Sequence, residues 1–347
     1  MHFLAESYLH NLDPTALQLT DSFGIKWYGL SYLTGFVVAW LVMRWLSSTG
    51  RILLNATQVG DFITYAIVGV LVGGRLGYGL FYEPSLFWDF SADFPFWGIL
   101  AIQRGGMASH GGMIGCLLFM LIFARRSGIP WLHLLDVTAF VAPPGLFFGR
   151  LANFINGELW GIPLAADRQS NPPWWSIKYP EEVHTLPMEQ VQGLQPLLQE
   201  PQTIDLHQQI IIEAYAGNQP LIDSMIPLLP ARYPSQFFQA ASDGPVLLLL
   251  LIAVWLVARK PGVVAGWFLI GYGILREVTE LFRERHVGAL EVGEFRTAMV
   301  LSIGLILAGL LMVIWSSSRQ TDRVGGLLRP APGDEKDEAP PDREHFA

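Results

Sequence analysis

The segment from Gly149 to Gly161, GRLANFINGELWG, places an arginine, two asparagines and a glutamate directly after a long apolar stretch. An α-helix turns by about 100° per residue, so a helix through this segment would gather its polar and glycine positions on one face. These positions are Arg150, Asn153, Gly157, Glu158 and Gly161. The pattern predicts a charged stripe where glycines let a ligand or a second helix approach closely. The alternative is an ion pair at a helix end with glycine packing.

Two further apolar stretches also carry arginine. Arg75 lies in GGRLGYGLFY, and Arg276 lies in GYGILREVTELFRE with Glu280 four residues later. A charged side chain near the centre of a bilayer costs about 2.5–3.5 kcal/mol on insertion scales, so each one needs a partner or a function. An intrahelical pair alone contributes about 0.2–0.5 kcal/mol, which does not offset the burial of both ends.

Guanidinium groups suit phosphate because their planar fork of N–H donors is permanently charged. Three separate apolar spans each bring one arginine, namely Arg75, Arg150 and Arg276. The sequence therefore predicts that these side chains converge on a phosphate-bearing ligand in a cavity.

The glycine-rich stretch RGGMASHGGMIG holds His110 at the start of another apolar span. Most lone histidines are satisfied core or interface residues, but an imidazole with an ordinary pKa of about 6.5 is also a credible proton acceptor. No GKS or GKT follows these glycines, which argues against a nucleotide. The chain has no HExxH or cysteine–histidine arrangement and no GxSxG elbow, so we expect neither a metal nor a cofactor nor a serine nucleophile. Its one cysteine, Cys116, is expected to be a small core residue.

The composition is that of a membrane protein. Of 347 residues, 51% are hydrophobic and 15% are charged, against about 25% charged in an ordinary soluble domain. The mean hydropathy is +0.36, and the apolar residues form long runs. We therefore predict an all-α, polytopic membrane protein with about seven transmembrane helices. The expected spans are roughly Trp27–Trp45, Phe62–Phe81, Gly111–Phe123, Leu132–Phe148, Val246–Val257, Val263–Phe282 and Thr297–Trp315.

These spans divide the chain into four parts. Residues 1–161 hold the first four spans, and their first 22 residues are expected to form an interfacial segment, in which Phe3, Leu4, Tyr8 and Leu9 would make an amphipathic helix. Residues 162–233, rich in proline, glutamine and carboxylates, form an insertion. Residues 234–318 hold the last three spans, and residues 319–347 form a polar tail that is expected to be disordered.

The basic residues predict the orientation. When the spans alternate, all of these residues fall on one side: Arg44, Arg51, Arg125, Arg126, Arg259, Lys260, Arg319 and Arg323. The positive-inside rule then places the amino terminus outside, the carboxyl terminus in the cytoplasm, and the insertion and Gly149–Gly161 at the outer face.

Taken together, these motifs resemble the prolipoprotein diacylglyceryl transferase family. GRLANFINGELWG is similar to the family signature, and KWYGLSYLTGF, GGRLGYGLFY, RGGMASHGGMIG, YPSQFF and GYGILREVTELFR match further family segments in order. The resemblance covers about residues 24–316 apart from the insertion. Ala152 stands where glycine is commoner, and the insertion is longer than in compact members, which leaves the shape of the outer lid open.

The resemblance implies a bacterial inner-membrane transferase that catalyses the first step of lipoprotein maturation. It would move the diacylglyceryl group of phosphatidylglycerol to the lipobox cysteine of a preprolipoprotein signal peptide, forming a thioether and releasing glycerol phosphate. Neither nucleic acid nor a cofactor is expected. The family's functional residues carry over to Tyr28, Arg75, His110, Arg150, Asn153, Glu158, Gly161, Arg276 and Glu280.

The roles expected of these residues follow from the chemistry. Arg150 and Arg276 would hold and polarise the phosphate, with Glu158 and Glu280 orienting the two guanidinium groups. Asn153 and Tyr28 would donate hydrogen bonds to the head group, which Arg75 and Gly161 would also line. His110 is expected to be the general base. In the alternative, His110 positions lipid or peptide while the arginine–carboxylate system handles the proton.

Two other function classes remain open at this point. A transporter or channel for an anionic solute would use the same arginines, but it would also need polar residues along the full membrane depth. A lipid-binding scaffold would use the same cavity without catalysis. Thioether formation on a lipobox peptide separates a transferase from both.

Overall fold

The computed structural model describes residues 7–20, 23–92, 94–102, 105–199, 204–284, 291–292 and 295–328. The predictions for Phe3, Leu4 and residues 329–347 lie outside these ranges. The chain forms two compact units, each built from several segments. The first unit comprises residues 1–35, 143–248 and 271–306, and the second comprises residues 36–142, 249–270 and 307–347.

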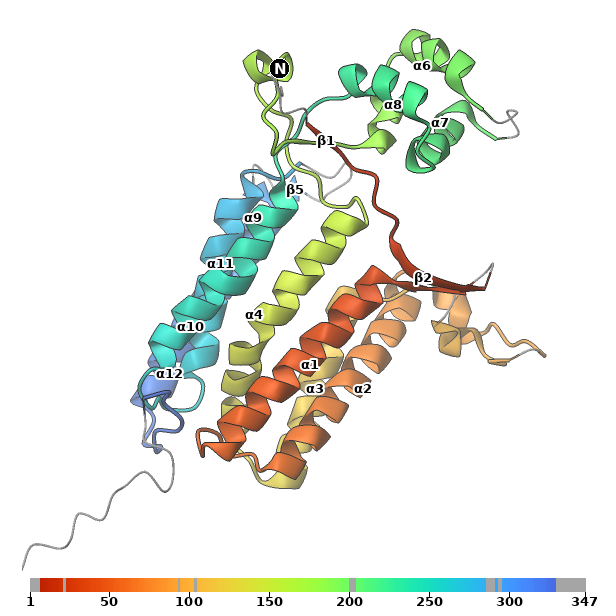
Figure 1. Cartoon of the computed structure of the whole chain (residues 1–347). Coiled ribbons are helices and arrows are strands. Elements are labelled where there is room, and N and C mark those ends of the chain that lie inside the picture. Colours follow the sequence, from red (N-terminus) through yellow and green to blue (C-terminus); the bar gives the residue numbers. More distant parts are fainter. Residues whose placement is uncertain are drawn as a thin grey trace, which may run out of the picture. The chain divides into compact units, whose positions relative to one another are not determined.

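The protein is mainly α-helical, and its long helices coincide with the predicted spans (Figure 1). They are α1 (Trp27–Ser48), α2 (Ala56–Phe81), α3 (Ser109–Ser127), α4 (Trp131–Ile155), α9 (Ser235–Ala241) continued by α10 (Leu247–Trp255), α11 (Val263–Glu280) and α12 (Thr297–Ser318). Five of these helical stretches are long and apolar enough to cross a membrane: Trp27–Ser48, Ala56–Phe81, Trp131–Ile155, Ser235–Trp255 and Met299–Ser318. The more polar helices α3 and α11 do not reach that level.

Helices α2 and α3 pack backbone against backbone in the second unit (Figure 1). A Cβ added at Gly73 would meet the Gly111 carbonyl oxygen and come within 2.7 Å of the Gly115 Cα. One added at Gly77 would lie 2.8 Å from the Gly111 Cα. Small residues four apart let membrane helices approach in this way, where van der Waals contact replaces the hydrophobic effect. Glycine at these positions therefore sets the spacing of the helix that begins at Ser109.

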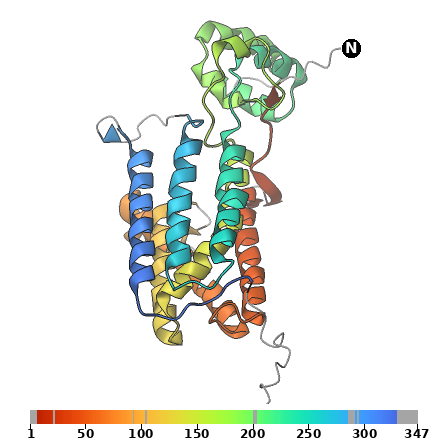
Figure 2. The ribbon, with the colours of Figure 1, turned by 90° about the vertical axis from the view of Figure 1, so that its left-hand side faces the viewer.

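Specific capping groups define an end of each of the helices α2, α3 and α11. Asn55 and Gln58 form a reciprocal capping box at the start of α2, and Gly128 ends α3 with φ +72°. In the second unit the buried Asp136 carboxylate accepts the N–H groups of Gly262 and Ala265, each at 2.7 Å, at the start of α11. Helices α11 and α12 then run side by side (Figure 2).

The described part of the amino-terminal segment, which starts at residue 7, forms strands rather than the predicted amphipathic helix. Strand β1 (Tyr8–Leu9) pairs in parallel with β4 (Ile177–Lys178), while β2 (Thr15–Thr20) and β3 (Phe23–Lys26) pair antiparallel. The helix prediction is wrong for Tyr8 and Leu9, because these residues pair with a strand of the distant insertion, which a local periodicity does not reveal.

The insertion in the first unit forms a small helical layer with its own hydrophobic core (Figure 2). Its helices are α5 (Ala166–Gln169), α6 (Met188–Leu194), α7 (Leu206–Tyr215) and α8 (Gln219–Met225), with the 3₁₀ turns Pro180–Thr185, Gln195–Leu197 and Ile226–Leu228. Val191, Ile210, Leu221 and Met225 are fully buried at its centre. This segment is therefore a folded layer and not an open loop.

Two short pieces complete the fold. Strands β5 (Glu291–Val292) and β6 (Phe295–Arg296) pair antiparallel before α12. After α12, Val324 pairs with Arg259 through two backbone hydrogen bonds of 3.1 and 2.7 Å, and Leu327 donates to the Trp255 carbonyl at 2.9 Å. The tail is predicted to be disordered from residue 319, but residues 324–328 pair with the end of α10 and the loop after it, within the second unit.

Because α2 and α3 pack through their glycines, replacing glycine by alanine should change the stability of the protein differently at two positions of α2. Gly73→Ala should destabilise the protein by about 1–3 kcal/mol, because the new methyl group overpacks a backbone contact. Gly60→Ala is the matched control, since a Cβ there meets nothing within 4 Å, and it should be neutral or slightly stabilising. Thermal unfolding of the purified variants in detergent measures both. Equal melting temperatures would contradict the packing argument.

Candidate active site

Helix α4 ends at Ile155, inside the GRLANFINGELWG motif. The backbone N–H groups of Gly157 and Glu158 donate to the carbonyls of Phe154 and Asn153, each at 2.9 Å. Gly157 has φ +64°, the left-handed conformation that glycine adopts at little cost at a helix C-terminus. This Schellman turn reverses the chain within two residues of the helix end.

The predicted helical face running on to Gly161 is therefore wrong, and only Arg150 and Asn153 of that set lie on the helix. The turn brings Glu158 back beside the helix end. Its carboxylate accepts from Asn153 Nδ2 at 3.1 Å and from Asn156 Nδ2 at 3.3 Å. Among the described residues, Glu158 has no arginine within ion-pair distance. It orients the Asn153 amide rather than Arg150.

The YPSQFF motif supports this turn from the start of α9. Ser235 and Gln236 are fully buried. Ser235 Oγ donates to the Leu159 carbonyl at 2.7 Å, and Gln236 Nε2 donates to the Glu158 carbonyl at 2.6 Å and to the Tyr179 hydroxyl at 2.9 Å. Leu159 has φ +60°, a strained conformation for leucine that costs on the order of 1 kcal/mol. The two side chains therefore hold the motif in a shape that it would not adopt alone.

Arg150 makes its ion pair with a residue that the sequence analysis did not select. Its Nε donates to Asp243 Oδ2 at 2.8 Å, and Asp243 is only 1% exposed. Tyr272 also interacts with the Arg150 guanidinium. Asp243 lies in the π-helical turn Ser242–Val246 between α9 and α10, where Pro245 interrupts regular helical hydrogen bonding. The signal that could have found it was an acidic residue leading into the apolar run PVLLLLL.

Arg276 and Glu280 lie on one face of α11, as their spacing predicted. The Glu280 carboxylate is 4.0 Å from Arg276 Nη2 and 3.6 Å from Arg283 Nη1. Glu280 thus lies between two guanidinium groups. Arg283 belongs to the segment GYGILREVTELFRE, which the sequence analysis singled out for Arg276 and Glu280 only.

Arg150, Arg276, Arg283, Asp243 and Glu280 together form what we call the arginine cluster, all within the first unit. Arg283 lies close enough to Arg276 and Arg150 for their charges to interact. Three guanidinium groups face two carboxylates, so the cluster carries a net positive charge. Such a cluster, set among apolar helices, is chemically suited to an anionic phosphate group.

Gly161 lies where three chain segments cross. A Cβ at this position would clash with the Tyr233 carbonyl group and lie 2.8 Å from its carbon atom. It would also lie 3.1 Å from the Phe282 carbonyl oxygen. The neighbouring Ile162 N–H donates to the Phe282 carbonyl at 3.0 Å. Backbone packing therefore requires glycine at position 161. The sequence analysis expected a different role for Gly161, namely contact with the lipid head group.

Arg232 joins the insertion to this crossing. Its guanidinium contacts the carboxylates of Glu182 at 2.5 Å and Glu284 at 2.9 Å, and it donates to the Gly161 carbonyl at 2.7 Å. It also lies 5.4 Å from the centre of the Trp160 ring. Burial alone would lower the pKa of Arg232, but the hydrogen bond and charge of Glu182, followed by those of Glu284, raise it above its ordinary value. Arg232 is therefore a permanent cation that anchors the insertion.

Tyr28 lies in the first turn of α1 and packs on Tyr32, with ring centres 5.3 Å apart. Its side chain is half-buried. The contacts described for Tyr28 do not include the arginine cluster.

Arg75 belongs to the second unit and is surrounded by backbone carbonyls. It is 5% exposed, and its five hydrogen bonds match the five N–H groups of a guanidinium. The acceptors, at 2.6–3.2 Å, are the carbonyls of Gly98, Ile99, Ala101, Gly105 and Gly106. These residues form the loop before α3, which includes the 3₁₀ turn Gly98–Leu100. The burial of Arg75 therefore needs no anionic ligand. Burial was the reason to predict that Arg75 converges with the other arginines on a phosphate, and that reason no longer applies.

His110 lies in the first turn of α3, also in the second unit, with an exposed side chain. The neighbouring Gly111 packs against α2, which fixes the backbone at the start of α3. Within the described part of the chain, His, Cys, Asp and Glu form no group of three or more that could hold a metal ion.

Residues 14–315 match the family model of the prolipoprotein diacylglyceryl transferases. The chain belongs to this family. The match spans the helices of both units and confirms the resemblance found in the sequence motifs.

Relatives named phosphatidylglycerol–prolipoprotein diacylglyceryl transferase align over nearly the whole chain. The relative from Bdellovibrio bacteriovorus is 40% identical over an alignment 337 residues long, and the alignment covers 89% of this chain and 94% of the relative. That from Ralstonia pickettii is 36% identical, covering 88% and 94%, and that from Oleidesulfovibrio alaskensis is 35% identical, covering 87% and 92%.

The carbonyl cage of Arg75 predicts a structural phenotype. Arg75→Lys keeps the charge but has three N–H donors in place of five, and hydrogen bonds to a charged group contribute about 1.5–3 kcal/mol each. The variant should lose several kcal/mol of stability, and residues 98–107 should become sensitive to protease in lipid-free detergent. Arg44→Lys, at an exposed position of α1, is the control. A wild-type digestion pattern would contradict the cage.

Proposed function

We propose that this protein transfers the diacylglyceryl group of phosphatidylglycerol to the lipobox cysteine thiol of a preprolipoprotein, the first step of bacterial lipoprotein maturation. The observation that carries the proposal is the positively charged arginine cluster in a chain of this family. In the reaction, the thiolate sulfur attacks the terminal glyceryl carbon and forms a thioether. The bond from that carbon to the phosphate oxygen breaks, and glycerol phosphate leaves with the electron pair.

The reaction makes two physical demands. A cysteine thiol with an ordinary pKa of about 8.5 must lose its proton. The negative charge that remains on the departing phosphate must also be stabilised by groups already in place, because groups held in advance need no reorganisation during the reaction.

The arginine cluster meets the second demand. Arg150 and Arg276 bind the phosphate through their N–H groups, and Asp243 and Glu280 hold these guanidinium groups in position. The roles differ from those expected from the sequence, because Asp243 takes the place of Glu158 as the partner of Arg150. Arg283, which shares Glu280 with Arg276, adds positive charge.

The remaining predicted residues have separate roles in this proposal. Asn153, with its amide held by Glu158, donates to the glycerol head group, and Tyr28 donates a further hydrogen bond. Gly161 acts through the backbone crossing, and Arg75 orders the loop that precedes α3. His110, with its exposed imidazole, accepts the thiol proton. In the alternative to this base role, His110 positions lipid or peptide.

We further propose that α3 and α11 also cross the membrane, giving seven spans in the bacterial inner membrane. The polar face of α11 then belongs to the phosphate site, which accounts for its lower hydropathy. The distribution of basic residues supports an external amino terminus, a cytoplasmic carboxyl terminus and an outward-facing insertion. Under this orientation the end of α4 and the arginine cluster lie near the outer leaflet.

The decisive experiment incubates purified protein with radiolabelled phosphatidylglycerol and a lipobox peptide. A transferase labels the peptide through a thioether that survives alkaline hydrolysis. An anion transporter or a lipid-binding scaffold leaves the peptide unlabelled, and that outcome would refute the proposal.

The ion pair with Asp243 predicts a specific loss of turnover. Asp243→Ala leaves the Arg150 guanidinium without its carboxylate, and turnover should fall roughly 100-fold, the size of effect seen when a preorganised donor is lost. Asp243→Asn, which keeps an acceptor for Arg150 Nε, should lose less. In an Arg150→Lys background, Asp243→Ala should have little further effect, since the two residues act together.

The control for Asp243 is Asp223→Ala, which removes an exposed carboxylate from α8 and should leave turnover unchanged. Wild-type turnover in Asp243→Ala would show that the carboxylate does not position Arg150.

The role of His110 is tested by the pH dependence of thioether formation. His110→Gln should lower the rate by a factor of roughly 10²–10⁴, the usual contribution of a general base. The residual rate should rise with pH as the thiol ionises on its own near pH 8.5. Ser109→Ala, at the preceding exposed position, is the control. Near-full turnover with an unchanged pH profile would remove the base role and favour the positioning role.

A further inference from the structure

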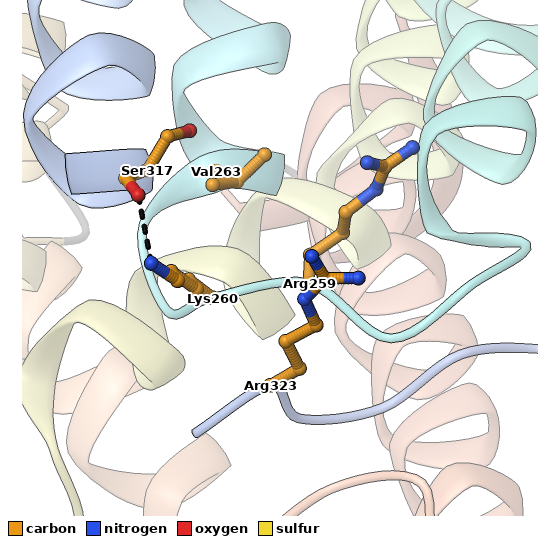
Figure 3. Close-up of a pocket in the computed structure, with 5 residues that line it drawn as sticks. All are labelled: Arg259, Lys260, Val263, Ser317 and Arg323. Carbon is orange, nitrogen blue, oxygen red and sulfur yellow. Dashed lines mark hydrogen bonds between the residues drawn. The ribbon is translucent and has the colours of Figure 1, made fainter. Parts of the chain in front are cut away.

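A small basic hollow lies at the ends of α10, α11 and α12 in the second unit (Figure 3). It is lined by Arg259, Lys260, Val263, Ser317 and Arg323 and has a volume of about 130 Å³. One water molecule needs about 10–15 Å³ of such space, so the hollow can hold a group of the size of a phosphate.

Two of its cations have an ordinary structural role. Lys260 Nζ donates to the carbonyls of Ser317 at 2.7 Å and Arg319 at 2.5 Å, at the C-terminal end of α12. Arg259 Nε donates to the Val254 carbonyl near the end of α10 at 2.8 Å. Cations often cap the carboxyl ends of helices in this way. Capping uses two of three N–H groups of Lys260 and one of five of Arg259.

Arg323 has no such explanation. It lies beyond the end of α12, and the pairing of its neighbour Val324 with Arg259 brings it to the hollow. Figure 3 shows its side chain rising from the returning segment toward the loop that carries Arg259 and Lys260. Within the described ranges, none of these three cations has a carboxylate within ion-pair distance.

The nearby amino end of α11 does not provide the binding groups. The Asp136 carboxylate already accepts the N–H groups of Gly262 and Ala265 there. The remaining donors in the hollow are therefore the side chains of Arg259, Lys260 and Arg323. The hollow is thus lined by three cationic side chains and no carboxylate, so its lining attracts an anion.

We propose that this basic hollow binds a phosphate-bearing anion, supplied either by the head group of an anionic phospholipid or as free phosphate. The site is separate from the arginine cluster, and it does not depend on the transfer reaction. Lys260 and Arg323 supply the charge, and the apolar Val263 bounds the hollow beside them. The returning segment Val324–Leu328 makes the site by carrying Arg323 into place.

Native mass spectrometry of the full-length protein in detergent tests the proposal. The probes are short-chain phosphatidic acid, phosphatidylcholine with the same acyl chains, and inorganic phosphate. The test variant is Lys260→Gln/Arg323→Gln. The matched control is Arg319→Gln, which removes a cation near the same helix end. The Arg319 guanidinium lies 4.7 Å from the centre of the Trp315 ring and does not line the hollow.

Each basic residue near a membrane surface contributes about fivefold to anion binding, so the double variant should bind phosphatidic acid roughly 25-fold more weakly. Arg319→Gln should change the affinity by less than about twofold, and phosphatidylcholine should bind the hollow weakly in every variant. Because Lys260 also caps α12, the single variant Arg323→Gln, which should bind about fivefold more weakly, tests the site without disturbing that cap.

The inorganic phosphate probe distinguishes the two sources. Competition by phosphate with the lipid supports a site for free phosphate, whereas lipid binding that phosphate does not displace supports a head-group site. Equal phosphatidic acid affinity in Arg323→Gln, Arg319→Gln and wild type would overturn the proposal. Transfer activity should be unchanged in Arg323→Gln, which separates this site from the proposed catalytic one.

Discussion

The structure depends on how each buried guanidinium group is compensated. A permanently charged side chain cannot become neutral when it is taken from water, so the fold must supply acceptors around it. Arg75 receives five backbone carbonyls, Arg150 receives a buried carboxylate, and Arg232 receives two carboxylates and a carbonyl. The same residue type therefore performs three different tasks, and only the acceptors distinguish them.

This distinction separates structural arginines from a site for a ligand. The donors of Arg75 are all used by one loop, which accounts for its burial in full. The arginine cluster is different, because three cations share two carboxylates and Glu280 lies at 4.0 and 3.6 Å from its arginines. Three guanidinium groups gathered around two carboxylates are chemically suited to a phosphate ligand. This contrast is why the proposed chemistry is placed at Arg150 and Arg276.

The signature segment also combines two tasks. Its helical half carries Arg150 and Asn153, while its second half turns back through Gly157 and meets two other chain segments at Gly161. Ser235 and Gln236 hold the backbone of that turn. The conformation of the motif thus depends on residues almost eighty positions later in the chain. The physical role of YPSQFF is to hold this turn.

The sequence alone determined that the protein is helical and apolar, where its long helices lie and to which family it belongs, because these properties follow from runs and spacings of neighbouring residues. The spacing of Arg276 and Glu280 also predicted their contact within one helix. Tertiary structure alone decided which acceptor meets which arginine. Asp243 is 93 positions from Arg150, and the carbonyls around Arg75 become acceptors only because a loop folds over it. Periodicity describes one element at a time, whereas compensation of a buried charge depends on groups that separate elements bring together.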